Sequence, residues 1–494
     1  MTSARRRVML ITPPYHTGVV EAAGVWLPLH LVYLAGAARQ AGAEVYLYDA
    51  MSLRHDHDAI AKEIERFRPD VVGVTAITAM EPDARRVCRS AKAVDPRILT
   101  LLGNQHPTFM WREILGADPA VEAIVCGEGE QTLAEVVAAV AATPGAAHTT
   151  DLGPVRGVAW RRDGIAVQNP PRPLCADLDR LTPAWDAVDW PRYFYRPHPA
   201  GRLAIISTSR GCQKQCSFCS QQKFWARSWR GRRPLAVVEE LERLRDRFDV
   251  QVAMLADETP TVDPTRWQEI LRLLIDRRVG VELLMETRID DILRDAALLG
   301  QYRAAGISHI YVGVESTSQA TLDLYKKETR VADAKRAIAM INDHGIVSET
   351  SFVLGTLDET PASIARTVEL AKWYAPDMAF FLALTPWPYA DLYPQLEAHV
   401  TSRDYSRYNL IEPVVKPRSM TIDEVRRALL RATGSFFHDK FARLESLPAA
   451  KRAYLVDVLK LLIEHSYLKD HMREMAAQHE MPAAVAAMLA TLGE

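Results

Sequence analysis

Short apolar runs alternate with longer amphipathic segments through the first 140 residues of the chain. A short apolar run predicts a buried strand, and apolar positions spaced three and four apart predict a helix. Strands separated by helices of about ten residues are typical of a parallel, doubly wound α/β sheet, which binds ligands at the carboxyl ends of its strands. The predicted strands are 8–12, 44–49, 70–75, 98–102 and 123–126, and the predicted helices are 29–40, 58–68 and 82–93.

Residues 141–200 interrupt this pattern, are rich in proline and contain one hairpin signal, Asp163-Gly164. We interpret them as a linker between a first domain, 1–140, and a second unit, 201–400, in which the alternation resumes. Six strand-and-helix repeats over about 180 residues favour a partial (β/α)6 barrel over a closed eight-stranded one. Residues 401–494 are predicted to form a helical domain. The predicted barrel strands are 203–208, 251–256, 281–287, 307–314, 347–354 and 378–384, and the predicted helices are 235–248, 264–277, 290–305, 331–344 and 360–374.

The composition excludes several classes of function. The net charge is −2 and no basic cluster appears, so we expect no nucleic-acid partner. No apolar run approaches the roughly 18 residues of a membrane span. Pro13 interrupts the apolar run that follows the basic N-terminus, which does not fit a signal peptide, and we expect a cytoplasmic protein.

Three of the six cysteines lie within eight residues, in the segment Cys212-Gln-Lys-Gln-Cys216-Ser-Phe-Cys219. The segment follows a predicted strand, so the thiols lie on a loop at the strand's carboxyl end. Thiolates bind iron–sulfur clusters, and three of them leave one iron of a [4Fe–4S] cube without a protein ligand. The alternative is a structural zinc site, but zinc takes four ligands and no nearby His or Cys supplies the fourth. The spacing therefore favours a cluster with one open iron.

A C-x3-C-x2-C motif after the first strand of a βα barrel, with Phe218 before the last cysteine, resembles the radical S-adenosylmethionine (SAM) superfamily. The resemblance implies that SAM binds the open iron and is cleaved to a radical that abstracts hydrogen from the substrate. It also implies carboxylates and an arginine at later strand ends that bind the amine, ribose and carboxylate of SAM. The alternative is that these residues are helix caps or solvated loop residues. The implied SAM contacts are Asp257, Glu258, Glu286, Arg288, Glu315, Ser316 and Gly355.

The first 140 residues resemble the cobalamin-binding, Rossmann-like domain that precedes the barrel in one branch of this superfamily. The motif D-x-H-x-x-G, whose histidine binds cobalt in many cobalamin proteins, is absent, so we expect no axial histidine. A nucleotide-binding Rossmann domain is the alternative, although the loop after the first strand lacks G-x-G-x-x-G. Small residues would let a flat corrin approach the backbone. The implied cobalamin contacts are Trp26, Leu27, Thr75, Gly103, His106 as a hydrogen-bonding wall residue, Gly127, Glu128 and Gly129.

Longer strings, among them Tyr15 to Gly18 and Thr385-Pro-Trp-Pro-Tyr389, resemble one family of this branch. It is the family of anaerobic magnesium-protoporphyrin IX monomethyl ester oxidative cyclases. The resemblance implies closure of the isocyclic ring on a methyl-propionate side chain of a tetrapyrrole, with an electron donor such as flavodoxin or ferredoxin. Trp225, Trp387 and Tyr389 would then face the flat macrocycle.

The sequence departs from that family at several positions. Asn104-Gln105 replaces a Gly-Ile pair in the cobalamin loop, and residues 440–494 match poorly. A cobalamin-dependent radical SAM C-methyltransferase, which transfers a methyl group from methylcobalamin to an unactivated carbon, stays open as the alternative because it shares every cofactor motif. A sensor that binds the same cofactors is a third interpretation, although the C-terminal region shows no output domain.

Overall fold

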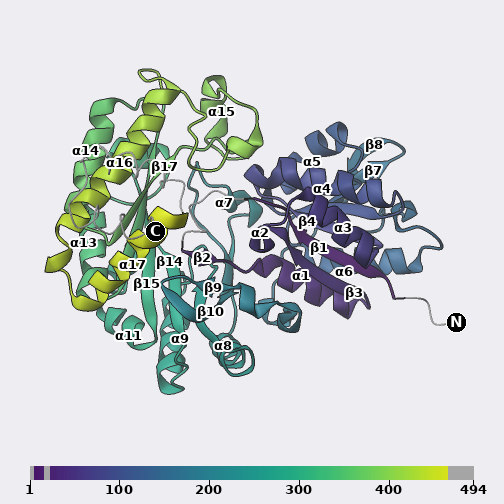
Figure 1. The fold of residues 1–494 in the computed structure, drawn as a ribbon, viewed down its shortest axis with the longest axis horizontal. Helices are drawn as coiled ribbons and strands as arrows, with labels where there is room; N and C mark the ends of the chain where they lie inside the picture. Colours follow the sequence, from purple (N-terminus) through teal and green to yellow (C-terminus); the bar gives the residue numbers. More distant parts are fainter. Residues whose placement is uncertain (1–4, 16–22, 466–494) are drawn as a thin grey trace.

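The computed structural model describes residues 5–15 and 23–465. Two sheet-based units lie side by side in it, and the cysteine-bearing segment lies between them (Figure 1). Residues 16–18, part of one string behind the family resemblance, fall outside the described residues, as do residues 466–494 of the predicted helical domain.

The N-terminal sheet has five parallel strands in the order β3-β1-β4-β5-β6, as the alternating pattern predicts. The strands are β1 (Arg7–Thr12), β3 (Glu44–Asp49), β4 (Val71–Thr75), β5 (Leu99–Gly103) and β6 (Ala123–Val125). The helices are α1 (Leu29–Gln40), α2 (Ala50–Leu53), α3 (His57–Phe67), α4 (Glu81–Val94), α5 (Gln105–Ala117) and α6 (Glu130–Ala142).

Both faces of this sheet are buried. Successive residues of a strand point to opposite sides, so each strand contributes side chains to a core on each face. Met9 and Ile11 of β1 belong to a core formed with α3, α4 and α5. Val8 and Leu10, which alternate with these two residues along the strand, belong to a second core formed with α1 and α6. The continuous apolar strands thus form the middle of a three-layer unit.

The hairpin inside the predicted linker belongs to the N-terminal sheet. Strands β7 (Val158–Arg162) and β8 (Ile165–Gln168) extend the sheet, with β7 antiparallel to β6. Asp163 and Gly164 join them with φ angles of +52° and +79°, which fit a two-residue hairpin turn. The first unit therefore extends beyond residue 140, and only the later part of 141–200 connects the two units.

The second unit is a curved, open sheet, which confirms the predicted partial barrel. Its six parallel strands follow the order β10-β13-β14-β15-β16-β17. They are β10 (His198–Ile206), β13 (Val250–Leu255), β14 (Glu282–Thr287), β15 (Ile307–Glu315), β16 (Val347–Leu354) and β17 (Met378–Ala383). Two short strands, β9 (Phe194–Tyr195) and β2 (Gly24–Val25), extend the β10 edge, so a segment of the N-terminal unit joins the barrel sheet.

Helices cover the outer face of the barrel and form its main core. They are α8 (Pro234–Phe248), α9 (Pro264–Asp276), α10 (Ile289–Arg294), α11 (Leu299–Ala304), α12 (Gln319–Leu324), α13 (Val331–Asp343) and α14 (Pro361–Tyr374). The predicted helix 290–305 is divided into α10 and α11, because buried Asp295 ends α10 and accepts a 2.6 Å hydrogen bond from the Tyr302 hydroxyl.

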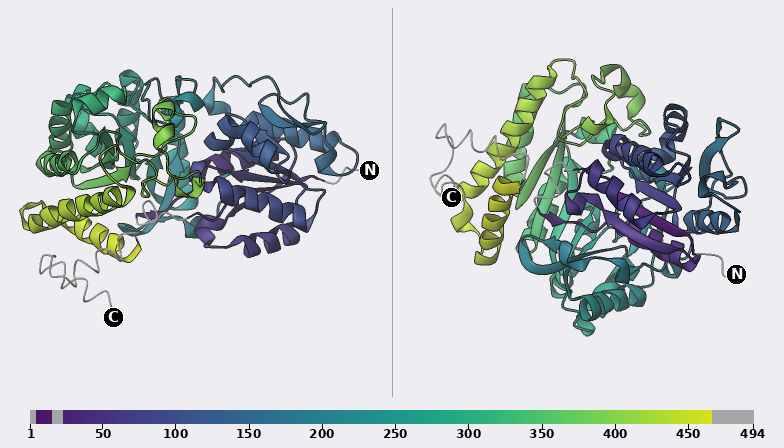
Figure 2. Two further views of the ribbon diagram at one scale, coloured as in Figure 1. Left: turned by 90° about the horizontal axis from the view of Figure 1, so that it is seen from above. Right: turned by 45° about the vertical axis from the view of Figure 1, so that its right-hand side comes forward.

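The C-terminal helices α16 (Ile422–Ala442) and α17 (Ala449–His465) lie on the barrel, away from the N-terminal sheet (Figure 2). Helix α16 packs against α14 and β17, and the capping box of Thr421 and Glu424 fixes its start. Before it, α15 (Tyr393–Leu396) follows the last strand. Among the described residues, no helix is both long and apolar enough to span a bilayer.

Replacing Trp267 by alanine is expected to lower the free energy of unfolding by about 3–5 kcal/mol. The indole is 0% exposed and packs against Tyr302, with 5.6 Å between ring centroids, so its removal leaves a cavity in the barrel core. Urea denaturation followed by circular dichroism measures the change. Trp373→Ala is the control, since this side chain is 59% exposed, and a similar loss in both variants would contradict the core assignment.

Candidate active site

The cysteine-bearing loop follows the first barrel strand and is fixed at both ends. Strand β11 (Ser209–Gly211) pairs with β12 (Trp229–Gly231), and the loop between them carries the cysteines and α7 (Gln221–Phe224). Gly211 has a φ of +99°, and a Cβ there would lie 2.1 Å from the Ser228 carbonyl oxygen, so only glycine fits this turn. Farther along, the Ser217 amide donates to the Tyr325 carbonyl oxygen at 2.8 Å.

The three thiols share this loop without forming a cage for one ion. Among residues 5–15 and 23–465, no three His, Cys, Asp or Glu side chains converge as ligands of a single metal ion would. In a cubane each thiolate binds a different iron, so its protein ligands need not converge on one point. Burial raises the pKa of the Cys212 thiol and raises that of the Cys219 thiol to about 12. Both are protonated without metal, so metal binding must release protons.

Asp257 and Glu258, which follow β13, hold the loop in place. The buried Asp257 carboxylate accepts hydrogen bonds from the Thr208 amide at 2.7 Å and from the Ser209 hydroxyl at 2.6 Å. Glu258 accepts from the Gly211 amide at 3.1 Å and from the indole of Trp225. Both oxygens of Asp257 are therefore occupied by the strand that leads into the cysteine loop.

Glu286, near the end of β14, differs from these carboxylates because no described residue forms a hydrogen bond or ion pair with it. Burial raises the pKa of Glu286 to about 8, and the neighbouring Glu258 and Asp257 add to the rise. Arg288 follows, donating to Asp290 at 2.9 Å and to the Lys327 carbonyl oxygen at 2.7 Å. The free carboxyl group matches a cationic ligand such as the amine of SAM.

The end of β15 holds a buried ion pair. Glu315 has a φ of +64°, a conformation that glutamate seldom adopts, and Lys327 donates to its carboxylate at 2.8 Å. A Cβ at Gly313 would lie 2.3 Å from the Glu315 carboxylate, so only glycine leaves room for the pair. Ser316 accepts from the Ser318 amide at 3.1 Å, and the Gly355 amide, after β16, donates to Glu359 at 3.3 Å.

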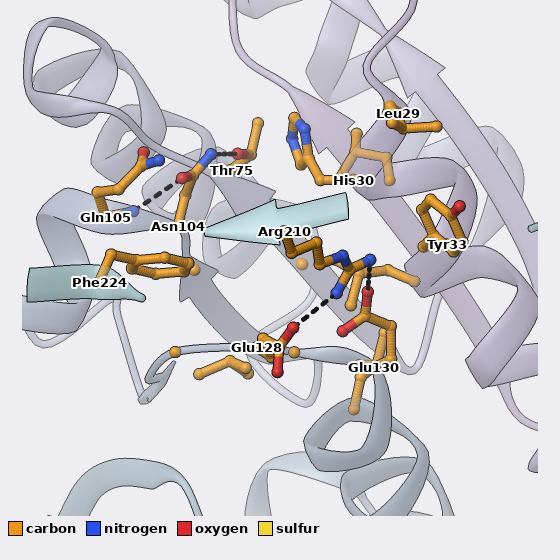
Figure 3. A pocket seen from close by; sticks show the side chains of 18 of the residues that line it. Leu29, His30, Tyr33, Thr75, Asn104, Gln105, Glu128, Glu130, Arg210 and Phe224 are labelled. Carbon is orange, nitrogen blue, oxygen red and sulfur yellow. Dashed lines mark hydrogen bonds and ion pairs between the residues drawn. The ribbon is translucent and has the colours of Figure 1, made fainter. Parts of the chain in front are cut away.

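A cavity of about 320 Å³ lies between the N-terminal sheet and the cysteine loop (Figure 3). Five of the eight predicted cobalamin contacts line it, namely Thr75, Gly103, Gly127, Glu128 and Gly129. A Cβ at Gly127 would meet no atom within 4 Å, and one at Gly103 would meet only Val125, at 3.8 Å. The glycines therefore keep space open at the carboxyl end of the sheet, which fits the approach of a flat corrin to the backbone.

Trp26, Leu27 and His106 do not line this cavity, so their predicted contact with cobalamin stays a prediction. Pairing of β2 with β9 draws the segment after it to the barrel, where Leu27 is buried in the main core and Trp26 packs against Tyr195. His106 is 0% exposed, and its ring lies 3.2 Å from the Thr78 hydroxyl.

The structure shows the surroundings of two of the aromatic residues predicted to face a macrocycle. Tyr389 stacks on Phe109, with 4.7 Å between ring centroids, and its hydroxyl lies 2.9 Å from that of Thr78. It therefore packs at the junction of the two units. Trp225 lines the cavity beside the N-terminal sheet. The prediction that Trp387 faces a macrocycle stays untested.

Glu128 has partners that its sequence context did not reveal. Arg210 donates to Glu128 at 3.0 Å and to Glu130 at 2.7 Å (Figure 3). Arg230 donates to Glu128 at 2.9 Å. The Arg210 guanidinium also lies 5.0 Å from the centroid of the Tyr33 ring. Glu128 thus belongs to an ion-pair network between the two units, and its carboxylate is engaged before any ligand binds.

Several cavity residues were not predicted from the sequence, among them His30, Tyr33, Asn104, Arg210 and Phe224. Asn104 has a φ of +90° and a ψ of −169°, a region that strongly favours glycine, and its amide donates to the Thr75 hydroxyl at 2.9 Å. The signal in the sequence was that Asn104 replaces a glycine of the family that the chain resembles. His30 and Tyr33 lie one helical turn apart, a spacing that also fits an ordinary buried helix face.

Comparisons with known proteins match both units. A family model of the B12 binding domain matches residues 15–137, and one of the radical SAM superfamily matches residues 206–371. The anaerobic magnesium-protoporphyrin IX monomethyl ester cyclase of Rubrivivax gelatinosus is 39% identical over 466 residues, which cover 93% of this chain and 83% of the relative. An uncharacterized methyltransferase of Pyrococcus horikoshii is 28% identical over 435 residues, which cover 87% of this chain and 92% of the relative.

The fold has a counterpart among solved structures. The radical SAM methyltransferase TsrM from Kitasatospora setae, with cobalamin and a [4Fe–4S] cluster bound, aligns with a TM-score of 0.66 at 20% identity, over 86% of this chain and 81% of that chain. The chain is an enzyme that uses a [4Fe–4S] cluster, SAM and cobalamin. It belongs to the cobalamin-dependent radical SAM family of the anaerobic magnesium-protoporphyrin IX monomethyl ester cyclases.

Proposed function

We propose that this enzyme oxidises the methyl-propionate side chain of magnesium-protoporphyrin IX monomethyl ester and closes it into the isocyclic ring. The observation that carries the proposal is the 39% identity to a cyclase over 93% of the chain, which includes both cofactor-binding units. The cluster and SAM together supply a carbon radical that removes a hydrogen atom from the substrate, and cobalamin supplies electron or radical transfer. We expect the reaction to take place in the cytoplasm, where thiols stay reduced.

In this proposal, Cys212, Cys216 and Cys219 bind the cluster as thiolates. Asp257 and Glu258 act on the loop rather than on a ligand, because their carboxylates hold Thr208, Ser209 and Gly211 in place. The hydrogen bonds fix the direction in which the loop leaves the sheet. The open iron therefore keeps one position relative to the strand ends that bind SAM.

Glu286 and Arg288 are the charged contacts proposed for SAM, Glu286 for its amine and Arg288 for its carboxylate. Arg288 is 7% exposed, and its guanidinium lies close enough to Cys216 to interact with that side chain. Its position therefore suits a ligand that also reaches the cluster. Glu315, Ser316 and Gly355 complete the proposed site, with the Lys327 ion pair orienting the Glu315 carboxylate.

We propose that cobalamin lies in the cavity between the units, against Thr75, Gly103, Gly127 and Gly129. Glu128 contributes through its ion pairs with Arg210 and Arg230, which hold the barrel side of the cavity against the N-terminal side. Cobalamin held there would supply its chemistry beside the cysteine loop, which lines the same cavity through Gln221, Phe224 and Trp225.

A flavodoxin or ferredoxin is the proposed electron donor. Lys214 lies in the cysteine loop, and Lys223 and Arg227 follow it, each with about 34% to 45% of its side chain exposed. Such carriers present acidic surfaces around their cofactor, which these cations would complement.

Alanine at Cys212, Cys216 or Cys219 is expected to abolish cluster assembly and reductive SAM cleavage, because a cubane with only two protein thiolates loses a required ligand. Iron content, visible absorbance and 5′-deoxyadenosine release measure the effect after anaerobic reconstitution. Cys175→Ala is the control and should retain all three signals. Retained SAM cleavage in any of the three variants would refute the ligand assignment.

The products distinguish the two reactions that remain open. A cyclase should release 5′-deoxyadenosine without S-adenosylhomocysteine, whereas a C-methyltransferase uses a second SAM to methylate cobalamin and releases both. Incubation with magnesium-protoporphyrin IX monomethyl ester and a reductant, followed by mass spectrometry, should show the isocyclic ketone. S-adenosylhomocysteine in proportion to product would favour the methyltransferase instead.

Glu286→Gln is expected to weaken SAM binding by about 10- to 100-fold at pH 8.5, the cost of one hydrogen bond to a charged group. Because the pKa of Glu286 is raised to about 8, the wild-type carboxyl group must lose a proton to bind a cation. Its SAM affinity should therefore rise between pH 6.5 and 8, by up to about tenfold per pH unit, and level off above. Titration calorimetry on the reconstituted enzyme measures both effects.

The Glu286→Gln variant should lack this pH dependence. Glu269→Gln is the control, since Glu269 is an exposed carboxylate paired with Arg272 on α9. An unchanged slope in Glu286→Gln would assign the titrating group to another residue.

A further inference from the structure

Gln221 connects one of the three cysteines to the cavity between the two units. It is the second residue after Cys219 and the first residue of α7. Its backbone amide donates a hydrogen bond to the Cys219 sulfur at 3.3 Å. Its side-chain oxygen accepts a hydrogen bond at 3.0 Å from the side-chain amide of Gln105, the first residue of α5. Gln221 therefore contacts a proposed cluster ligand through its backbone and the N-terminal unit through its side chain.

The N-terminal end of this connection is fixed to the sheet. The Asn104 side chain accepts a hydrogen bond from the Gln105 backbone amide at 2.8 Å and donates one to the Thr75 hydroxyl at 2.9 Å (Figure 3). Thr75 ends β4, and Asn104 follows β5. A series of hydrogen bonds thus runs from the carboxyl ends of two strands to the Cys219 sulfur. Thr75, Asn104, Gln105 and Gln221 all line the cavity.

The cysteine loop also forms part of the cavity wall. Gln221, Phe224 and Trp225, at or just beyond the end of the cysteine motif, line the cavity. The Gln222 side chain donates to the Cys216 carbonyl oxygen at 3.1 Å, which ties α7 to a second cysteine. The wall and the proposed cluster ligands therefore belong to one short stretch of chain, and whatever holds the cysteines also holds the wall.

A cluster bound to three thiolates would fix this loop at three points within eight residues. A loop closed in this way has fewer conformations to lose. In cluster-free protein, the loop must become ordered when cobalamin binds against it, whereas in cluster-loaded protein it is ordered already, so cobalamin binds more tightly. By thermodynamic linkage, cobalamin must then strengthen cluster binding by the same factor.

We propose that the hydrogen bond between Gln105 and Gln221 couples the two cofactor sites, so that the cluster and cobalamin each raise the affinity of the enzyme for the other. Gln105 and Gln221 act as positioning residues, because they join the cysteine loop to the N-terminal wall of the cavity. The proposal rests on the placement of cobalamin in this cavity. It applies to a cyclase and to a methyltransferase alike.

Anaerobic equilibrium dialysis with hydroxocobalamin tests the coupling without measuring activity. In wild-type protein, reconstitution of the cluster should lower the Kd for hydroxocobalamin by about tenfold. In Gln105→Ile, which introduces the residue of the resembling family, the effect should fall to about twofold because the hydrogen bond is lost. Gln221→Leu should show the same reduction, and the double variant no further one, since both changes remove one interaction.

Gln213→Leu is the control, because Gln213 is an exposed glutamine of the same loop, and it should keep the wild-type effect. Equal Kd values with and without the cluster in wild-type protein would overturn the proposal. A full tenfold effect in Gln105→Ile would do the same.

The reciprocal measurement uses only cluster-loaded enzyme, so it does not require the cluster-free chain to be folded. Saturating hydroxocobalamin should raise the concentration of a ferrous chelator that removes half of the iron by about tenfold in wild-type enzyme and about twofold in Gln105→Ile. The absence of a rise in wild-type enzyme would overturn the proposal.

A cavity-filling variant tests the placement of cobalamin separately. Gly103 lines the cavity, and a Cβ there would meet only Val125, at 3.8 Å, so Gly103→Phe should fill the space and abolish hydroxocobalamin binding with or without the cluster. An unchanged Kd in Gly103→Phe would overturn the placement of cobalamin, and the coupling with it. A full effect in Gln105→Ile would overturn the coupling alone.

Discussion

Arg210 joins the two units beside the place where their cofactors must meet. It lies two residues before Cys212, and its guanidinium pairs with Glu128 and Glu130 of the N-terminal unit. The arginine and both carboxylates are largely buried, with 7% to 11% of each side chain exposed. Removing one partner of a buried ion pair leaves a desolvated charge, which costs several kcal/mol. The network therefore holds the cysteine loop and the cavity at one relative position, on which the proposed chemistry depends.

The strand ends around the cysteine loop concentrate acidic groups in a low-dielectric environment. Asp257 and Glu258 are satisfied by hydrogen bonds from the loop, whereas Glu286 is not, and its pKa is raised to about 8. Like charges in a buried site oppose one another's ionisation. A cationic ligand offsets this repulsion between carboxylates. The arrangement that disfavours the ionised form of Glu286 in the free protein therefore favours binding of a sulfonium compound with an ammonium group.

The regular elements were predictable because their apolar residues repeat with the period of a strand or a helix. The strand 347–354 and the helix 29–40 match β16 and α1 to the residue. The pattern did not assign α5, which begins in the left-handed turn at Asn104 and carries Pro107 in its first turn. It also placed the β7–β8 hairpin in a linker, because pairing with β6 is a contact that local periodicity does not encode.

The sequence by itself determined the cofactor chemistry, since the spacing of Cys212, Cys216 and Cys219 and the position of their loop after a strand follow from the order of residues alone. Only the tertiary structure decided which residues of the other loops face the cavity. Trp26 and His106 do not line it and pack against Tyr195 and Tyr405, whereas His30 and Arg210 do line it. The direction of a loop side chain depends on which distant element occupies the space beside it, and no local pattern contains that information.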